Sequence, residues 1–222
     1  MYNVSSSPHV KAKMTTGSIM RDVIIAMIPT SAFGIYNYTN LFGIKYGIHS
    51  ALLILITVIS CVAAEYIYTT ITDQKITIFD LSAVVTGMIL ALNLPCTFPY
   101  WKAALGGAFA IIIVKQLFGG LGQNFMNPAL GARCFLVLSF AGDMTAFYPK
   151  DVKGIDAATS ATPLTALKNA GESSASLIDM FIGNHAGTIG ETSIVALLIG
   201  AAYLVIRKII DVRIPLTYIA VF

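Results

Sequence analysis

The chain alternates between long apolar stretches and short polar connections. Seven apolar segments lie along its 222 residues, at 23–38, 48–71, 81–94, 101–118, 129–141, 192–206 and from 214 onward. A membrane-spanning helix takes about 20 residues, so the segments at 81–94 and 129–141 are too short to cross alone. We predict partial or tilted helices there, packed within a bundle. Pro29 predicts a kink in the first segment.

Composition narrows the class of protein. Hydrophobic residues make up 56% of the chain and charged residues only 11%, whereas charged residues are about 25% of a soluble domain. Both values predict an all-α fold, a polytopic membrane helix bundle. No basic run with interleaved aromatic residues is present, which argues against nucleic-acid binding. The polar start, residues 1–16, lacks an apolar stretch behind a basic head and therefore does not read as a cleavable signal.

A weak internal duplication organises the segments. Residues 47–50, at the start of the second segment, resemble residues 190–193 at the start of the sixth. Each of these two segments is followed by a short charged turn, at 73–76 and at 211–214. We therefore divide the chain into a cytoplasmic N-terminal part (1–22), a first repeat of about five segments (23–141), a long polar connection (142–190) and the start of a second repeat (191–222). On this division the second repeat is incomplete, and we expect the full protein to be longer. Repeats of this kind are common in transporter folds.

Basic residues indicate the orientation, because cytoplasmic loops carry an excess of lysine and arginine. With a cytoplasmic N-terminus and seven crossings, nine basic residues fall inside and five outside. Those inside are Lys11, Lys13, Arg21, Lys75, Lys115, Arg133, Arg207, Lys208 and Arg213. Those outside are Lys45, Lys102, Lys150, Lys153 and Lys168. The long connection then lies on the extracytoplasmic side.

The sequence assigns no functional site to the cysteines, the histidines or the charged residues within apolar segments. The cysteines are scattered, so no disulfide or metal site is assigned, and Cys61 and Cys134 are expected in the core. The three histidines are dispersed as well. Charged residues at membrane depth mark function by default, but Glu65 and Asp80 can lie at interfaces. No single residue indicates a sodium or proton path.

The polar connection contains one stretch with two competing interpretations, Asp156 to Leu164. As a helix start, Thr162 is an N-cap and Pro163 occupies the first helical position. As an attachment site, Thr162 is a hydroxyl that an enzyme modifies after reading the residues around it, since a threonine hydroxyl is a poor nucleophile by itself. Short Ser/Thr motifs recur by chance, so the surrounding sequence has to decide between the two.

The second interpretation rests on a similarity. The stretch is similar to the threonine flavinylation signature, Asp-x-x-Ser/Thr-Gly-Ala-Thr, in which a flavin transferase joins FMN to the last threonine by a phosphoester. The matching positions here are Asp156, Thr159, Ser160, Ala161 and Thr162. Ser160 replaces the usual glycine. The similarity implies that Thr162 carries the FMN.

The rest of the chain resembles one family. This family comprises the D subunits of Rnf complexes, the ion-pumping ferredoxin:NAD oxidoreductases, and the B subunits of sodium-pumping NADH:quinone oxidoreductases. The resemblance rests on residues 7–10, 80–87, 94–95, 118–124, 127–129, 156–164 and 190–193. These stretches follow one another along nearly the whole chain, and family members usually continue by several more helices.

The resemblance implies two flavins. One is FMN, covalently held on Thr162 at the outer face. The other is riboflavin, held without a covalent bond among the helices by Asn124 and Asn127, with Gly87 allowing its ring to approach the backbone. Local capping ahead of Pro128 is an equally open role for the asparagines. For Arg133, packing against the flavin-bearing core and neutralising an acidic partner both stay open.

The function implied is that of a membrane electron-transfer subunit in a redox-driven Na⁺ or H⁺ pump of the ferredoxin:NAD oxidoreductase type. The chain would have no catalytic or metal-binding residues of its own. Its expected partners are a second covalent-FMN subunit, iron–sulfur subunits, a flavin transferase and the lipid of a bacterial or archaeal cytoplasmic membrane. The rival reading is a channel-like or secondary transporter for a small solute, which would need no flavin.

Overall fold

A computed structural model of the chain describes residues 14–73, 77–147, 177–183, 187–191 and 193–221. Within these ranges the regular structure is entirely helical. The helices are α1 (Thr16–Phe42), α2 (Ile44–Ile71), α3 (Ser82–Leu92), α4 (Tyr100–Phe109), α5 (Pro128–Ser139), α6 (Ala141–Met144), α8 (Leu177–Ile182), α9 (Ile194–Ile206) and α10 (Arg213–Val221). Three short segments accompany them, η1 (Ile78–Asp80), the π-helical η2 (Ala110–Lys115) and η3 (Gln116–Phe118).

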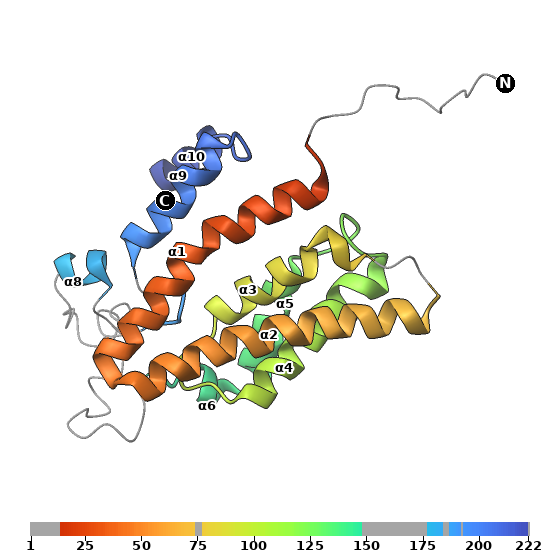
Figure 1. The fold of residues 1–222 in the computed structure, drawn as a ribbon, viewed down its shortest axis with the longest axis horizontal. Coiled ribbons are helices and arrows are strands. Elements are labelled where there is room, and N and C mark those ends of the chain that lie inside the picture. Colours follow the sequence, from red (N-terminus) through yellow and green to blue (C-terminus); the bar gives the residue numbers. More distant parts are fainter. Residues whose placement is uncertain (1–13, 74–76, 148–176, 184–186, 192, 222) are drawn as a thin grey trace.

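Among the described residues, three helical stretches are long and apolar enough to cross a membrane: Thr16–Phe42, Ile44–Ile71 and Tyr100–Phe118. The first begins with a capping box, in which Thr15 and Ser18 satisfy each other's backbone N–H groups. It continues through Pro29, and Figure 1 shows it bending along its length, as the proline predicts. The all-α membrane bundle expected from the sequence is confirmed.

The two short segments form half-length helices. α3 has 11 residues and α5 has 12, about half of what a crossing needs. α3 packs against α2, and α5 packs against α3 and α4. Two glycines let α4 pack closely: a Cβ at Gly106 would lie 2.6 Å from Leu136 of α5, and one at Gly107 would lie 3.1 Å from Cys61 of α2. The prediction of partial helices inside the bundle is confirmed.

The interrupted end of α3 is completed by a segment from much later in the chain. The backbone N–H of Ile189 donates to the carbonyl of Leu94 (3.0 Å), and that of Gly190 donates to the carbonyl of Leu92 (2.7 Å). Helix ends leave carbonyls without intrahelical partners, and the bond from Gly190 satisfies that of Leu92, the last residue of α3. Gly190 is required here, since a Cβ would lie 2.8 Å from the side chain of Leu92.

α9 packs along α1 and joins the later part of the chain to the earlier part (Figure 1). A Cβ on Gly200 would lie 2.3 Å from the carbonyl oxygen of Ala26, so the two backbones touch. Further along α9, Arg207 forms an ion pair with Asp22 at 3.0 Å, and the Tyr203 hydroxyl donates to the same carboxylate. The contact therefore combines close backbone packing with a polar clamp.

One expectation about burial is wrong. Cys134 is exposed rather than part of the core, because apolar residues of a membrane helix face lipid as readily as they face protein. Glu65 is completely buried in the protein, so its carboxylate is not solvated, at whatever depth it lies. Cys61, in contrast, lies in the core as expected.

Candidate functional site

The two asparagines of the predicted flavin site, Asn124 and Asn127, lie in the connection between α4 and α5. Its backbone turns sharply, and three of its residues have positive φ angles: Gly119, Gly120 and Gly122, at 105°, 87° and 90°. Only glycine adopts such angles without strain. The glycines let the chain fold back, so that the rings of Phe118 and Phe125 meet with centroids 4.5 Å apart.

The two asparagines have different surroundings. Asn127 caps α5, because its side-chain oxygen accepts hydrogen bonds from the backbone N–H groups of Ala129 (3.0 Å) and Leu130 (3.5 Å). The capping role ahead of Pro128 is therefore confirmed. Asn124 caps nothing, and its Oδ1 is buried without a partner among the described residues. A buried amide oxygen without a donor is unfavourable, so a ligand that donates a hydrogen bond there fits this site.

Gly87 and Arg133 lie elsewhere in the bundle. Gly87 faces α2, where an added Cβ would lie 2.8 Å from the Cα of Val58, so its open side is filled by protein. Arg133, on α5, donates from Nη1 to Oδ1 of Asn93 at 2.8 Å. Among the described residues this partner is an amide and not an acid. Arg133 thus joins the end of α3 to α5.

Sequence reasoning missed a buried ion network. Glu65 of α2 and Lys115 of η2 are 0% and 2% exposed, and their charged atoms lie 2.7 Å apart. The same carboxylate oxygen, Oε1, also accepts hydrogen bonds from Thr77 (2.6 Å) and Gln116 (3.1 Å). The other oxygen, Oε2, has no partner in the described part of the chain. Such a pair is stable only when hydrogen bonds and geometry offset the loss of water.

The network continues to the start of α3. Lys115 donates to the hydroxyl of Ser82 (2.6 Å), which in turn donates to Oδ1 of Asp80 (2.6 Å). Asp80 also accepts the backbone N–H of Ser82 at 2.8 Å. The chain of contacts from Glu65 through Lys115 and Ser82 to Asp80 therefore connects α2, the end of the α4 stretch, α3 and η1. The only sequence signal was the presence of charges in apolar segments, which at membrane depth require partners.

A cavity of about 810 Å³ lies between α1, α3, α9 and α10. Its walls are mainly aliphatic, and its polar side chains are Thr30, Asn93, Thr188, Glu191 and Tyr218. The Thr188 hydroxyl is buried without a partner among the described residues. Asn93 follows the last residue of α3, and Thr188 and Glu191 flank the segment that is hydrogen-bonded to Leu92 and Leu94, so three of these polar side chains belong to the end of α3 and the segment bonded there.

The predicted flavinylation stretch, with Asp156, Thr159, Ser160, Ala161 and Thr162, lies outside the described residues. The parts of the connection on either side of it are placed. Before it, the carbonyl of Ala146 accepts a hydrogen bond from Thr97. After it, the carbonyl of Gly187 accepts one from Tyr38 at 2.7 Å.

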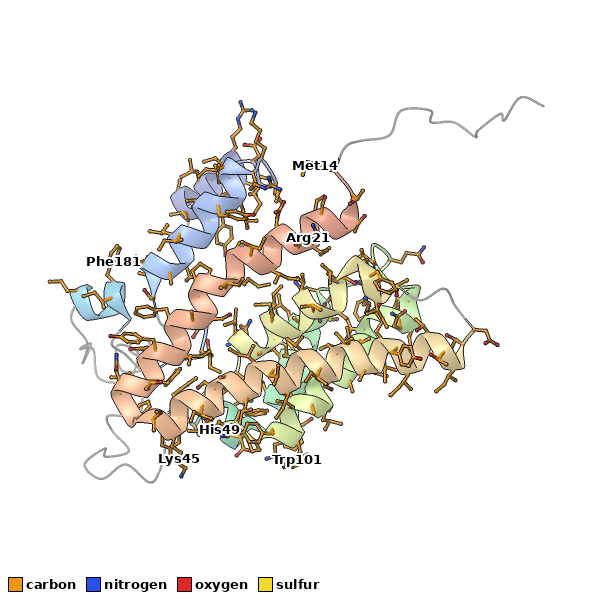
Figure 2. The ribbon with its side chains drawn as sticks, in the orientation of Figure 1. Met14, Arg21, Lys45, His49, Trp101 and Phe181 are labelled. Carbon is orange, nitrogen blue, oxygen red and sulfur yellow. The ribbon has the colours of Figure 1, made fainter. Side chains whose placement is uncertain are left out.

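Both anchoring residues belong to one end of the bundle. Tyr38 is near the end of α1 and packs in the same core cluster as Cys96 and Phe98, which flank Thr97. Figure 2 shows Lys45, His49 and Trp101, from the starts of α2 and α4, away from Met14 and Arg21 at the other end of α1. The chain therefore leaves the bundle before residue 148 and returns after 176 at the same end.

Comparisons with known proteins give the same family. Residues 3–222 match the model of the NQR2, RnfD, RnfE family. The chain is 48% identical to the D subunit of the Na⁺-translocating ferredoxin:NAD⁺ oxidoreductase complex of Acetobacterium woodii, covering 97% of this chain and 66% of the relative. It is 37% identical to the D subunit of the proton-translocating ferredoxin:NAD⁺ oxidoreductase complex of Clostridium ljungdahlii, covering 99% and 66%. It is 32% identical to the D subunit of the ion-translocating oxidoreductase complex of Rhodobacter capsulatus, covering 97% and 66%.

The chain thus spans 66% of the length of each of these relatives. The match includes every described residue, and with them the asparagine connection, the ion network and the short helix α3. The chain therefore belongs to the NQR2, RnfD, RnfE family.

Proposed function

We propose that this chain is an electron-transfer subunit of an ion-translocating ferredoxin:NAD oxidoreductase complex, and that it carries FMN on Thr162 and a riboflavin at Asn124 and Asn127. The observation that carries the proposal is the 48% identity to the D subunit of a Na⁺-translocating complex. The flavinylation signature in the long connection and the unpartnered amide oxygen of Asn124 support the flavins. The coupling ion is not assigned, because the relatives' names include both Na⁺ and proton translocation.

On this proposal the flavins carry out the redox chemistry, and the protein binds and positions them. Bound flavin would supply one-electron transfer. Thr162 would act as a tether and needs no acid–base role. The hydrogen bonds at Ala146 and Gly187 hold both ends of the tether's connection against the bundle. Thr97 precedes the long α4 stretch, whereas Asn124 and Asn127 follow it, so the two flavins would lie near opposite faces of the membrane.

The proposed partners rest on the relatives' names, each of which describes a subunit of a complex. Electrons would come from or go to iron–sulfur and flavin centres on other subunits, and a flavin transferase would install the FMN.

A flavin count tests the proposal. The protein is co-produced with a flavin transferase and purified in mild detergent with its partner subunits, and acid then releases the non-covalent flavin for counting. We expect close to one riboflavin per chain to be released, and a denaturing gel of the same sample to show a fluorescent band at the mass of this chain. A colourless protein from cells with an active transferase would contradict the proposal and favour a solute transporter.

The proposed orientation is tested by cysteine labelling. Lys153 lies in the long connection, and we expect Lys153→Cys in intact cells to react with impermeant maleimide added from outside. Because Cys134 is exposed, the background needs Cys134→Ser, whereas Cys61 and Cys96 are buried. Lys208→Cys, in the turn between α9 and α10, is the matched control and should react only in inverted vesicles. Labelling with the opposite sidedness would reverse the orientation and move the FMN to the cytoplasmic face.

A further inference from the structure

Three side chains that line the cavity between α1, α3, α9 and α10 carry oxygen atoms without strong partners. Thr188 is 2% exposed, and its hydroxyl has no hydrogen-bond partner among the described residues. Thr30 is 4% exposed, and its hydroxyl makes no hydrogen bond in the described part of the chain. Glu191 forms no ion pair with a described residue, and its Oε2 accepts only a long bond from the backbone N–H of Thr188, at 3.4 Å. The cavity thus presents two hydroxyls and one carboxylate.

Packing at the end of α3 brings the three side chains together. Thr188 and Glu191 belong to one turn, in which the N–H of Glu191 donates to the carbonyl of Thr188 at 3.2 Å. Between them, Ile189 contacts α1, because a Cβ on Gly34 would lie 2.5 Å from the Ile189 carbonyl oxygen. Thr30 lies one helical turn before Gly34, and residues four apart share one face of a helix. Thr30 therefore faces the same turn.

This turn lies within the hydrocarbon layer of the membrane. α9 begins at Ile194, directly after the turn, and runs for 13 residues to Ile206, a length of about 20 Å. Beyond its far end, the charged turn at 207–213 marks the membrane surface. The hydrocarbon core is about 30 Å thick, so Glu191 lies well inside it. An ionisable residue at such a depth marks a functional site.

The charge of the cavity selects its ligand. Among the described residues that line it, Glu191 alone is charged. Arg133 donates to Oδ1 of Asn93 at the cavity wall, but it does not itself line the cavity. A carboxylate without a counter-charge is unfavourable in an apolar medium. The end of α3 adds the negative end of a helix dipole, so the site favours a cation, and one carboxylate balances a single positive charge.

We propose that Glu191, Thr188 and Thr30 bind one small monovalent cation at the end of α3, with Na⁺ as its probe. Carboxylate and hydroxyl oxygens are suitable ligands for hard cations, and in transporter folds the carboxyl ends of interrupted helices coordinate Na⁺. The inference rests on the proposed function for the role of the cation, which would be an ion that the complex translocates. Its binding can be measured without either flavin.

The site is tested by Na⁺ binding to the full protein in detergent. Protein made without a flavin transferase is transferred into choline chloride and titrated with NaCl at constant ionic strength. Binding of radioactive Na⁺ and the thermal midpoint are followed together. We expect saturable binding and a midpoint that rises with Na⁺, because a ligand of the folded state stabilises it. Equal midpoints in Na⁺ and choline, without saturable binding, would overturn the proposal.

The carboxylate is tested with variants that differ in charge. Glu191→Gln keeps the size of the side chain and should weaken Na⁺ binding about tenfold or more, because ligand charge governs cation affinity. Glu191→Asp keeps the charge and should retain saturable binding. Asp73→Asn, at an exposed acid that ends α2, is the matched control and should bind like the wild type. Wild-type affinity in Glu191→Gln would overturn the site.

The hydroxyls give a test that a purely structural role would not pass. Thr188→Val and Thr30→Val nearly keep the shape of threonine, and each should weaken Na⁺ binding several-fold. Without Na⁺, Thr188→Val should be at least as stable as the wild type, since an unpartnered buried hydroxyl is removed. Thr70→Val, where the hydroxyl bonds within α2 and is exposed, should leave Na⁺ binding unchanged. Equal affinity in all three variants would remove the hydroxyls from the site.

Flavin content separates this inference from the proposed function. In protein co-produced with the transferase, every variant should keep the fluorescent band of covalent FMN after denaturation. A flavin-bearing wild type with no saturable Na⁺ binding would overturn the inference and leave the proposed function intact. A wild type that binds Na⁺ through Glu191 but carries no flavin would contradict the proposed function and leave the cation site in place.

Discussion

Replacing Thr162 by valine is expected to abolish covalent flavin attachment. Valine has nearly the shape of threonine but no oxygen, and the phosphoester requires that oxygen. If Thr162 only capped a helix, the same change would cost about 0.5–2 kcal/mol and leave an assembled protein. The measurement is in-gel flavin fluorescence of denatured protein, with wild type and variant co-produced with a flavin transferase.

The neighbouring positions supply the control for this experiment. Asp156→Ala and Thr159→Ala should weaken labelling without abolishing it, because the transferase reads these residues but does not modify them. A fluorescent Thr162→Val band as bright as that of the wild type would show that another residue carries the flavin.

Breaking the buried ion pair is expected to have the largest effect on stability. Lys115→Met leaves the Glu65 carboxylate buried without its counter-charge, and the hydrogen bonds from Thr77 and Gln116 remain its only compensation among the described residues. Removing one partner of such a pair costs about 3–5 kcal/mol. We expect a strongly lowered thermal midpoint in detergent, measured by intrinsic fluorescence, and a low yield of folded protein.

Two further variants separate pairing from general damage. The double change Glu65→Gln with Lys115→Met removes both charges and should recover most of the lost stability. Lys102→Met breaks a partly exposed pair with Asp143, whose side chains are 16% and 41% exposed, and should cost less than about 1 kcal/mol. A double variant no more stable than Lys115→Met would mean that the two charges do not compensate each other.

Segment lengths and punctuation residues predicted much of the fold. The short stretches at 81–94 and 129–141 became α3 and α5, because Pro95 and the Asn127-Pro128 pair limit them. The cap at Asn127 followed from local chemistry, since an asparagine before a proline favours a helix start. Features of this kind can be predicted because they depend on only a few neighbouring residues.

Contacts between segments far apart in the chain could not be predicted from the sequence. Glu65 and Lys115 are 50 residues apart, and their meeting depends on the rotation of two helices and on the π-helical turn of η2. Cys134 shows a related difficulty. In water a helix hides its apolar face, but in lipid both faces are apolar, so the sequence does not reveal which residues face inward. The internal repeat and the domain boundaries stay predictions.

The most direct test of the account is the mass of one peptide. Trypsin cleaves after Lys153 and Lys168, which releases residues 154–168 with the whole signature inside. From protein co-produced with a flavin transferase, we predict this peptide to be heavier by FMN minus one water, with fragment ions that place the added mass on Thr162. An unmodified peptide, or an added mass on Thr159, would contradict the central claim.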